Sequence, residues 1–552
     1  MERLLLDYIY EHEERRPTQT FLTQPLRDGQ VVDYDWGQVL DQARRMASHL
    51  GSLGFERGAR IAILSKNNAH FIMAELAIWM GGFTTVAIFP NENPKTISYI
   101  LDHSDARLLF IGKLDDLERQ TAAIPPEIPC IAMPMAPVSD HPGWDAIVAQ
   151  SPRLSGKPGR RGDELMFIVY TSGSTGTPKG VMHSFERGTR ASEGLARDTF
   201  GAPSASGVRY RVLSYLPLPH IYERAVIECA SLVLGSTQIY FNDRLETFQA
   251  DLRRARPTQF ISVPRLWFKF QEGVFSQLSQ KKLDLLLSIP VIRTIVRRRI
   301  RKALGLDQVV EAGTASAPMP VSLLKWYRRL DLNLSEGLGM TEDFAYSHIA
   351  KGKDALPGSV GLPRLGVERR IAPDGELLLR SPGAFVGYHK RPDLDAEAFT
   401  EDGFFRTGDL AVIVPSGELR LTGRKQETFK TAKGKFVAPA PIEALIEESP
   451  LVELSLVTGA GLPAAYAVVA PVEDYRIRLD EPDVRKAFET EMRAVLARVN
   501  EQLADHEYLS KIVVSREPWT IENGCLTPTM KIKRRVIEDR IGRMPGNLLD
   551  LS

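Results

Sequence analysis

Apolar and polar positions form two long blocks that predict parallel sheets covered by helices. In the first block, apolar runs predict strands at 60–64, 84–89 and 107–112, separated by helical patterns near 69–80 and 96–103. In the second block, they predict strands at 211–216, 237–241 and 258–263, with the first helical pattern near 222–234. Because strand–helix–strand order favours parallel pairing, we expect two similar α/β halves that face each other.

The pattern changes twice towards the C-terminus. Between about 356 and 415, Gly and Pro interrupt short β-like runs, which predicts a small β-rich subdomain. Beyond 421–427, strands are expected near 454–459, 465–470 and 511–515. Between the second and third of these strands, a helix is expected with an apolar face of Val484, Phe488, Met492, Val495, Val499 and Leu503. We therefore expect a large N-terminal domain over 1–423 and a small, mobile α+β domain over 424–552.

Length and composition indicate a soluble enzyme with more than one domain. The chain has 552 residues, of which 43% are hydrophobic and 25% charged. Its 70 basic and 69 acidic side chains give a formal charge of +1, which offers no general case for nucleic-acid binding. No apolar run approaches the roughly 20 residues of a membrane span, and the acidic N-terminus is unlike a signal peptide. We expect a cytoplasmic location.

The stretch YTSGSTGTPKGVMHS at 170–184 is the first candidate for chemistry. It follows the apolar run 165–170 and is rich in Gly, Ser and Thr, whose backbone and hydroxyl groups can surround a phosphate. Lys179 adds a positive charge, but it precedes Gly180 and no Ser or Thr follows as in a Walker A loop. A flexible surface linker is the alternative. The position after a buried strand favours a nucleotide phosphate loop of another kind.

Five motifs occur in an order typical of one superfamily. They are the loop 170–184, EGLGMTE at 336–342, FRTGD at 405–409, GRK at 423–425 and TPTMKIKRR at 527–535. Over nearly its whole length the chain resembles the adenylate-forming enzymes, which include acyl-CoA synthetases, luciferases and peptide-synthetase adenylation domains. LPLPHIYER at 216–224, VPRLWFK at 263–269 and the form of the 336–342 motif resemble the long-chain acyl-CoA synthetases.

The resemblance implies a two-step reaction. A carboxylate attacks the α-phosphorus of ATP to give acyl-adenylate and pyrophosphate, and a thiol then displaces AMP. Negative charge gathers on phosphate oxygens in the first step, so donors and cations are needed there. By resemblance, the pyrophosphate cradle comprises Thr171, Ser172, Gly173, Ser174, Thr175, Gly176 and Lys179. The adenine side comprises Gly313 and Thr314 of the GTASAP segment, together with Gly337, Leu338, Gly339 and Met340.

The same resemblance assigns roles around the α-phosphate and ribose. Thr341 would meet the α-phosphate and Glu342 would ligate Mg²⁺, which prefers oxygen ligands; a helix N-cap is the alternative for Thr341. Asp409 would accept hydrogen bonds from the ribose hydroxyls, or else form an Asx-turn. Arg424 would reach the ribose or a phosphate, although a Gly-Arg-Lys sequence is most often a solvated turn.

Catalysis and domain movement are assigned to a few further positions. Lys531 would bridge the carboxylate and the α-phosphate, with Lys533 as its rival. His220 would lie near the carboxylate and the thiol path; an exposed turn is the alternative. Gln426 falls at the hinge, where the family commonly has Asp or Lys. Lys433–Gly434 replaces a usual Gly-Gly and could offer a cation to CoA.

These features predict an ATP- and Mg²⁺-dependent acyl-CoA synthetase for a medium- to long-chain fatty acid, with fatty acid, ATP and CoA as partners. The alternatives are ligation of an aryl acid or transfer to an acyl-carrier protein, and a nucleotide-binding relative without catalysis. The basic amphipathic stretch 292–304 predicts either a solvated helix or a peripheral contact with an anionic membrane, at its inner face. The sequence leaves chain length, acceptor and oligomeric state open.

Overall fold

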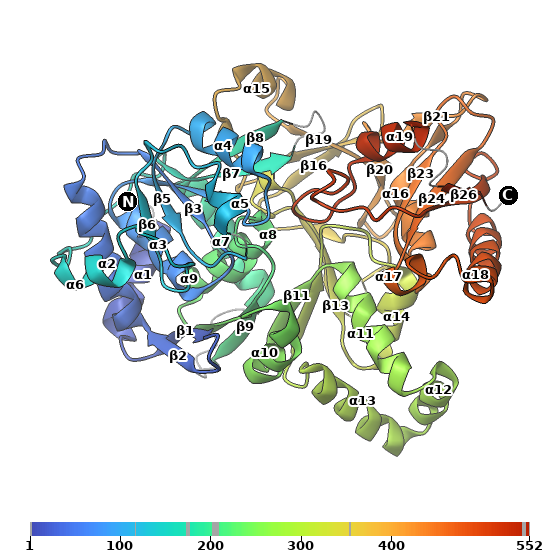
Figure 1. The fold of residues 1–552 in the computed structure, drawn as a ribbon, viewed down its shortest axis with the longest axis horizontal. Helices are drawn as coiled ribbons and strands as arrows, with labels where there is room; N and C mark the ends of the chain where they lie inside the picture. The colour runs from blue at the N-terminus through green and yellow to red at the C-terminus, as the bar shows by residue number, and fades with distance from the viewer. Residues whose placement is uncertain are drawn as a thin grey trace.

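The computed structural model describes residues 3–115, 117–172, 177–200, 209–352, 355–543 and 548–550. A large N-terminal region and a smaller C-terminal domain lie side by side (Figure 1). Both combine helices with sheets, as the sequence predicts. Within the part of the chain described, no helix is long and apolar enough to cross a membrane.

The first block forms the middle of a seven-stranded sheet with the order β18-β8-β7-β4-β3-β5-β6. Its strands are β3 (Arg60–Leu64), β4 (Thr84–Ile88), β5 (Ala106–Ile111), β6 (Cys130–Ala132), β7 (Leu165–Ser172), β8 (Pro178–Ser184) and β18 (Gly387–Tyr388). Strands β3 to β7 are parallel, whereas β8 and β18 are antiparallel. The sheet therefore has the predicted parallel centre, and the glycine-rich loop begins at the carboxyl end of β7.

Helices of the first part of the chain pack around this sheet. They are α1 (Leu5–Arg15), α2 (Trp36–Ser52), α3 (Ala69–Met80), α4 (Pro94–His103), α5 (Leu117–Thr121), α6 (Trp144–Gln150) and α7 (Phe185–Phe200). Helix α3 has the predicted bounds, and all its residues are buried. The largest hydrophobic core combines α1, α2 and α3 with β3 and β7.

The second block divides between two sheets, which corrects the expectation that its three strands form one α/β half similar to the first. Strands β9 (Tyr210–Ser214) and β10 (Thr237–Phe241) are parallel, but they complete a sheet with β1 (Thr20–Pro25) and β2 (Val31–Asp35). Strand β11 (Gln259–Ser262) begins a separate sheet, in the order β11-β12-β13-β14-β15. The remaining strands are β12 (Glu311–Thr314), β13 (Leu334–Leu338), β14 (His348–Ala350) and β15 (Leu362–Pro363). Local periodicity specifies strands, whereas partner choice depends on distant segments.

The predicted helix 222–234 is interrupted. It consists of α8 (Ile221–Glu223), a π-helical turn η1 (Arg224–Cys229) and α9 (Ala230–Leu234). Inside the core, Arg224 Nη2 lies 3.1 Å from Glu75 Oε1 of α3, and Arg224 Nε lies 3.8 Å from Glu228 Oε2. All three side chains have no solvent exposure. Burial and the neighbouring Glu75 carboxylate raise the pKa of Glu228. We call these three residues the buried triad; it joins α3 to the segment carrying His220.

Further helices support the second block. They are η2 (Leu245–Thr247), α10 (Phe248–Ala255), α11 (Pro264–Gln277), α12 (Gln280–Ser288), α13 (Pro290–Leu304), α14 (Val321–Arg329) and η3 (Thr341–Asp343). The expected β-rich subdomain is a sheet of order β16-β17-β19-β20. Its strands are β16 (Glu368–Ile371), β17 (Glu376–Arg380), β19 (Phe405–Ile413) and β20 (Leu419–Arg424), and α15 (Pro392–Ala398) follows β18.

The C-terminal domain is built on a sheet of order β23-β24-β25-β26. Its elements are β21 (Phe429–Lys430), β22 (Phe436–Val437), α16 (Pro439–Ile446), β23 (Val452–Thr458), β24 (Ala465–Pro471), α17 (Glu473–Arg476), α18 (Pro482–Asn500), β25 (Leu509–Ser515), α19 (Arg534–Arg543) and β26 (Leu548–Asp550). Phe488, Met492, Val495 and Val499 of α18 are buried against β24 and β25, as the pattern predicts. Val484, at the start of the predicted face, is half-buried and lies outside this core, and Leu503 packs beside the core but lies beyond the end of α18.

Candidate active site

A large cleft lies between the N-terminal region and the C-terminal domain, and both contribute to its walls. It opens at the carboxyl end of β13, where ligands of open α/β sheets commonly bind. Asn91 Nδ2 donates to Pro528 O (2.9 Å) and Ser322 Oγ to Glu448 Oε1 (2.9 Å). An Arg265–Glu453 ion pair also crosses between the two parts. These contacts hold the C-terminal domain against the N-terminal region, and the first of them involves the segment that carries Lys531.

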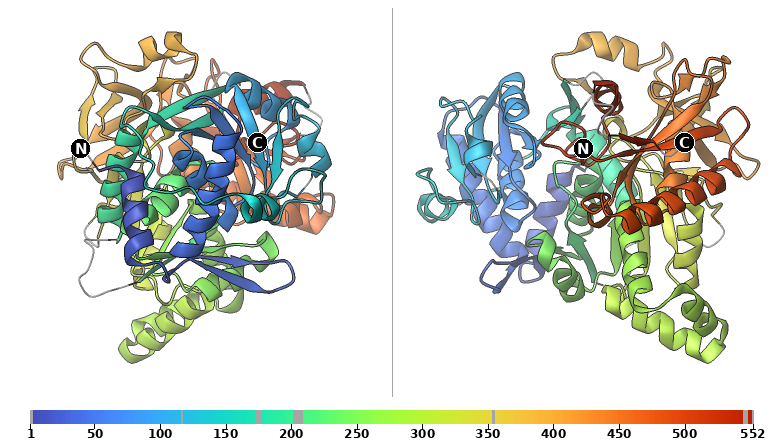
Figure 2. Two further views of the ribbon diagram at one scale, coloured as in Figure 1. Left: turned by 90° about the vertical axis from the view of Figure 1, so that its left-hand side faces the viewer. Right: turned by 45° about the vertical axis from the view of Figure 1, so that its right-hand side comes forward.

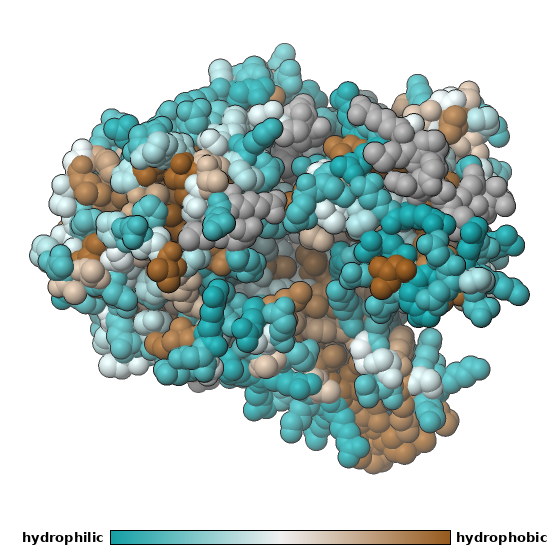
Figure 3. All heavy atoms as spheres, in the orientation of Figure 1, coloured by the Kyte–Doolittle hydropathy of each residue, from teal (hydrophilic) through white to brown (hydrophobic). Residues whose placement is uncertain are grey.

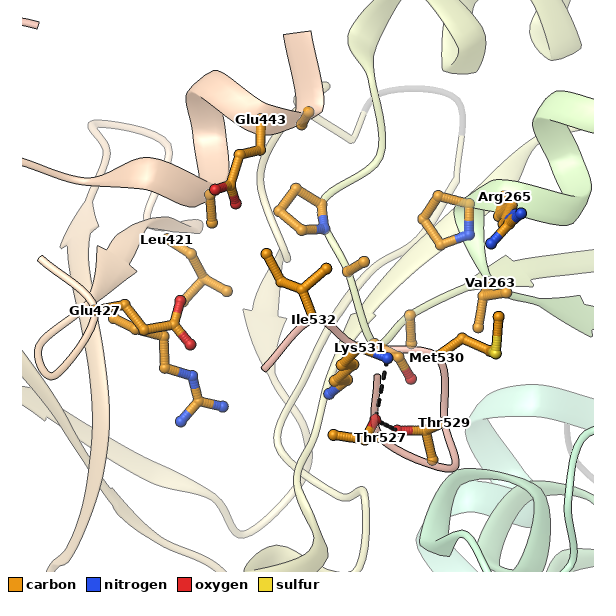
Figure 4. A pocket seen from close by; sticks show the side chains of 18 of the residues that line it. Val263, Arg265, Leu421, Glu427, Glu443, Thr527, Thr529, Met530, Lys531 and Ile532 are labelled. Atoms are coloured by element: carbon orange, nitrogen blue, oxygen red, sulfur yellow. Dashed lines mark hydrogen bonds between the residues drawn. The ribbon is translucent and has the colours of Figure 1, made fainter. Parts of the chain in front are cut away.

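A tight loop presents Lys531 to the cleft (Figure 4). Thr527 N donates to Lys531 O (2.8 Å), and Lys531 N donates to Thr527 Oγ1 (3.0 Å). Met530 has a φ of 63°, which reverses the chain direction. The loop therefore fixes the backbone of Lys531 firmly, although its sequence is that of a basic tail. Figure 4 shows it between Leu421 and Glu427 on one side and Val263 and Arg265 on the other.

Charged groups around Lys531 define its electrostatic environment. Its side chain is exposed within the cleft. Burial and the Arg424 guanidinium lower the pKa of Lys531, while the carboxylates of Asp409, Glu427 and Glu342 oppose this shift. By contrast, Lys533 lies towards Glu92. Burial raises the pKa of Glu92, and the positive charge of Lys533 opposes this shift. Of the two lysines, Lys531 thus faces the acidic part of the cleft.

Asp409 and Arg424 face each other on paired strands. They are register partners on β19 and β20, and Arg424 Nε lies 2.9 Å from Asp409 Oδ1. Burial raises the pKa of Asp409, while Arg424 and then Lys531 lower it. Asp409 lies within a strand and is paired with a cation, so the Asx-turn alternative does not describe it. Arg424 ends β20 and is half exposed, and Lys425 begins an exposed turn, so the solvated-turn alternative for the GRK motif stays open.

Glu342 is held in a short turn at the opposite wall. Tyr388 Oη donates to Glu342 Oε1 (2.9 Å), and the backbone oxygen of Thr341 lies 2.8 Å from His183 Nε2. Burial lowers the pKa of His183 to about 3, so its neutral ring can donate through Nε2. Met340, rather than Thr341, occupies the N-cap position of η3. The turn thus fixes the backbone and leaves the Thr341 hydroxyl and Glu342 at the cleft wall.

The segment 337–340, which comprises the last two residues of β13 and the two that follow it, also lines the cleft. Gly339 is sterically required, because a Cβ there would lie 2.5 Å from Ala345 Cα. Gly313 and Thr314 behave differently from expectation: they lie within β12, and the cleft wall starts at Ala315. Strand pairing with β11 and β13 turns them into the sheet.

The predicted phosphate loop can be placed only at its two ends. Gly173, Ser174, Thr175 and Gly176 lie outside the described residues, as does the side chain of Ser172. Thr171 and Lys179 are register partners on β7 and β8, and both line the cleft. Lys179 Nζ lies 4.7 Å from the centre of the Tyr388 ring. The lysine therefore approaches the same side chain that holds Glu342.

His220 lines the cleft from the N-terminus of α8. Tyr222 N donates to His220 Nδ1 (3.1 Å), so the ring caps the helix instead of lying in an exposed turn. Burial and, less strongly, Lys531 lower the pKa of His220 to about 3. The imidazole is therefore neutral, with Nε2 as the nitrogen that carries the proton.

Gln426 occupies the exposed turn after β20, next to the cleft. Lys425 Nζ, one residue earlier, lies 2.6 Å from Asp374 Oδ2 and thereby attaches the turn to the N-terminal region. Arg534, near Lys531, pairs with Glu427 at 3.1 Å. The turn is thus fixed on both sides of Gln426, as a connection between two rigid parts would be.

Three residues at the site were missed by the sequence analysis. Tyr388 and His183 hold the Thr341–Glu342 turn, and Glu427 lies beside Lys531 and Arg534. Glu427 directly follows the predicted hinge residue Gln426, and this position was the only sign of its role in the sequence. Tyr388 and His183 meet Glu342 and Thr341 only because β18 pairs with β8.

Comparison with known proteins defines the class to which this site belongs. Residues 9–389 match the AMP-binding enzyme family, and residues 427–540 match the AMP-binding enzyme C-terminal domain. The first match covers more than half of the chain, so the chain belongs to the AMP-binding enzyme family and is an adenylate-forming ligase. This confirms the predicted superfamily.

Particular relatives span nearly the whole chain. A long-chain-fatty-acid–CoA ligase of Mycobacterium tuberculosis is 28% identical over 96% of this chain and 94% of its own length. Long-chain-fatty-acid–CoA ligase 1 of Homo sapiens is 27% identical, over 91% of this chain and 80% of its own. Curated relatives therefore include several long-chain ligases.

Solved structures show the same fold. The adenylation domain of carboxylic acid reductase from Segniliparus rugosus, in complex with AMP, superposes with a TM-score of 0.81, at 22% identity. The superposition covers 98% of this chain and 93% of the reductase domain. An anthranilate CoA ligase in complex with anthranoyl-AMP gives a TM-score of 0.78 at 19% identity, covering 99% and 98%. At these identities the likeness establishes the fold alone.

Proposed function

We propose that this protein is an ATP- and Mg²⁺-dependent acyl-CoA ligase that activates a medium- to long-chain fatty acid. One observation carries the proposal: Lys531 of the C-terminal domain lies in the same cleft as Glu342, Asp409 and Arg424 of the N-terminal region. A cation that the C-terminal domain brings to carboxylates of the N-terminal region is suited to a reaction in which phosphate charge builds up. It is less suited to a protein that only holds a nucleotide.

Magnesium fits the oxygen donors at the cleft wall. Across the residues placed in the structure, there is no group of three or more His, Cys, Asp or Glu side chains that could form a metal cage. Mg²⁺ commonly uses one or two carboxylates with substrate phosphates and water, so Glu342 alone fits that mode. When bound, the ion would neutralise phosphate charge.

The remaining steps can be assigned to residues of this chain. Thr171 and Lys179 would bind the pyrophosphate end of ATP, and Asp409 would accept from the ribose hydroxyls. Lys531 would donate to the α-phosphate and the carboxylate oxygen together, which aligns the two reacting atoms. The domain 424–552 would then rotate about Gln426 for the thioester step and bring Lys433–Gly434 to the cleft.

The acid is proposed from the apolar part of the cleft and from the relatives. Val226, Phe268, Met319 and Leu323 line the cleft, which suits an alkyl chain. Pyrophosphate–ATP exchange tests activation, and a panel of acids from acetate to eicosanoate with ATP and CoA tests the substrate. A maximum at long chains supports the proposal. A preference for benzoates, or product only with an acyl-carrier protein, would contradict it.

Substituting Glu342→Gln should lower the rate of adenylation about 100-fold, because a lost contact to transition-state charge is worth ~3 kcal/mol. Glutamine keeps the shape and can still accept from Tyr388 Oη. Extra Mg²⁺ should restore part of the rate, and exchange kinetics at two Mg²⁺ concentrations measure this. Full activity at limiting Mg²⁺ would remove Glu342 from the metal site. Glu368→Gln, in the exposed strand β16, is the matched control.

His220→Ala should lower thioester formation about 100-fold while ATP affinity is unchanged, because a proton acceptor positioned beside the thiol path is lost. His220→Asn keeps a side-chain acceptor for the helix N-terminus, so it separates loss of folding from loss of chemistry. Because the His220 pKa is about 3, its ring is neutral throughout pH 5–8. The pH profiles of the wild type and of His220→Asn should therefore have the same shape near pH 6.5. An inflection that is present in the wild type and absent from the variant is not expected. Such an inflection would show that the ring takes up a proton during turnover.

A further inference from the structure

Helices α12 and α13 form a hairpin that projects from the body of the protein. Both additional views show it standing clear of the sheets (Figure 2). Its inner side is anchored, because Leu283, Leu287 and Leu304 are buried in the core beside α10 and α14. Its outer side meets no other part of the described chain and is free for a partner.

The outer side of this hairpin is unusually apolar. Leu285 is 65% exposed, Val291 73% and Ile295 50%, and Ile289 between the helices is 40% exposed. Figure 3 shows apolar side chains gathered at this end of the molecule, over the region labelled α12 and α13 in Figure 1. We call these four residues the apolar tip. A contiguous apolar surface of this kind marks an interaction site.

Cations lie directly beside the apolar tip. Arg298, Arg299 and Lys302 follow Val291 and Ile295 on the same face of α13; all three are exposed, and none has an ion-pair partner among the residues placed in the structure. Other arginines of the helix are used internally: Arg297 Nε donates to Arg329 O (2.6 Å) and Arg301 Nη2 to Val309 O (2.8 Å). The exposed cations thus take no part in the ion pairs that stabilise the described fold.

Acidic residues are absent from the outer side. Between Asp284 and Asp307 the sequence has no Asp or Glu, and Asp284 is neutralised by Arg329 at 2.6 Å. The surface therefore combines apolar side chains with uncompensated positive charge. That combination suits the boundary between acyl chains and anionic headgroups better than a protein surface.

We propose that the α12–α13 hairpin docks on an anionic lipid bilayer, with the apolar tip inserted among the headgroups. Helix α11, which leads into the hairpin, lines the cleft through Pro264, Arg265, Phe268 and Lys269. Docking would therefore bring the cleft wall close to the lipid phase. Delivery of a fatty acid from the bilayer rests on the proposed function, whereas binding to lipid does not.

Co-sedimentation of the full chain with vesicles tests the docking surface without ATP, CoA or acid. The wild type should bind vesicles of phosphatidylcholine and phosphatidylglycerol at 3:1, and bind pure phosphatidylcholine at least 10-fold more weakly. Val291→Glu/Ile295→Glu should reduce the binding at least 10-fold. The matched control is Val138→Glu/Leu245→Glu, which alters side chains 99% and 84% exposed outside the hairpin and should bind normally.

A second pair of variants isolates the charge. Arg298→Gln/Arg299→Gln should weaken binding to the anionic vesicles at least threefold and reduce its salt dependence. Arg493→Gln/Arg498→Gln removes the same charge from the exposed face of α18 and should have little effect. Circular dichroism and tryptophan fluorescence verify that each variant is folded.

Three results would overturn the proposal. The first is equal binding of the wild type to anionic and neutral vesicles, or to neither. The second is unchanged binding by Val291→Glu/Ile295→Glu. The third is a wild-type protein that does not bind vesicles but forms a concentration-dependent dimer, which Val291→Glu/Ile295→Glu abolishes. This result would assign the apolar tip to self-association. Because no substrate is present, each result is independent of the proposed acid and acceptor.

Discussion

Replacing Lys531 by alanine is expected to slow acyl-adenylate formation about 10³-fold, because positioned charge on the α-phosphate is lost. The second step, from synthetic acyl-adenylate and CoA, should proceed within about threefold of the wild-type rate. The tight loop is held by Thr527 and by the backbone, so the substitution should leave the fold intact. Pyrophosphate exchange and thioester release measure the two steps separately.

Lys533→Ala is the matched control, since this lysine faces Glu92 and should be dispensable for adenylation. Gln426→Pro restricts φ at the hinge and should show the opposite bias, with thioester formation impaired more than adenylation. Equal loss of both steps in a folded Lys531→Ala protein would refute the proposal that the C-terminal domain uses one orientation for adenylation and another for thioester formation. Full adenylation in that variant would transfer the role to Lys533.

The pH dependence of adenylation should follow Lys531. Burial and Arg424 lower its pKa below the ordinary lysine value, and in the proposed mechanism the protonated amine is the active form. The rate should therefore be at its plateau at lower pH and be lost as the pH rises through this lowered pKa. Thioester formation from synthetic acyl-adenylate, which does not use the amine, should lack that decline.

Replacing Arg224 by leucine should destabilise the protein by about 3–5 kcal/mol, because it leaves the Glu75 and Glu228 carboxyl groups buried without their cation. The raised pKa of Glu228 allows one of the two to stay protonated, but the second then requires charge compensation. Urea-induced unfolding followed by tryptophan fluorescence measures the loss, and His220 at the start of the same helical segment should be displaced with it.

Removing the whole buried triad provides the control for this explanation. Glu75→Leu/Arg224→Met/Glu228→Leu replaces the three charged groups with apolar ones of similar size, and should recover most of the wild-type stability. A triple variant no more stable than Arg224→Leu would show that the cost comes from packing. A single variant with wild-type stability would show that the ion pairs contribute little to the fold.

Much of this protein was predictable from local sequence. Apolar runs specified strands such as β3 and β10 and the buried helix α3, because the period of the pattern follows directly from backbone geometry. The order of the five motifs indicated the superfamily, since motif residues need no knowledge of their neighbours. The apolar face of α18 was likewise predictable, apart from Val484 outside the core and Leu503 beyond the end of the helix.

Only the tertiary structure decided which distant groups meet. It divided β9 and β10 from β11, turned Gly313 and Thr314 into a sheet, and placed His220 as a helix cap. It also distinguished Lys531 from Lys533 by their carboxylate neighbours, and brought Tyr388 to Glu342. Periodicity is a property of adjacent residues, whereas strand partners, ion pairs and shifted pKa values depend on the field and packing of segments hundreds of residues apart. For that reason the sequence by itself determined the elements and the chemical class, and the folded chain determined the site.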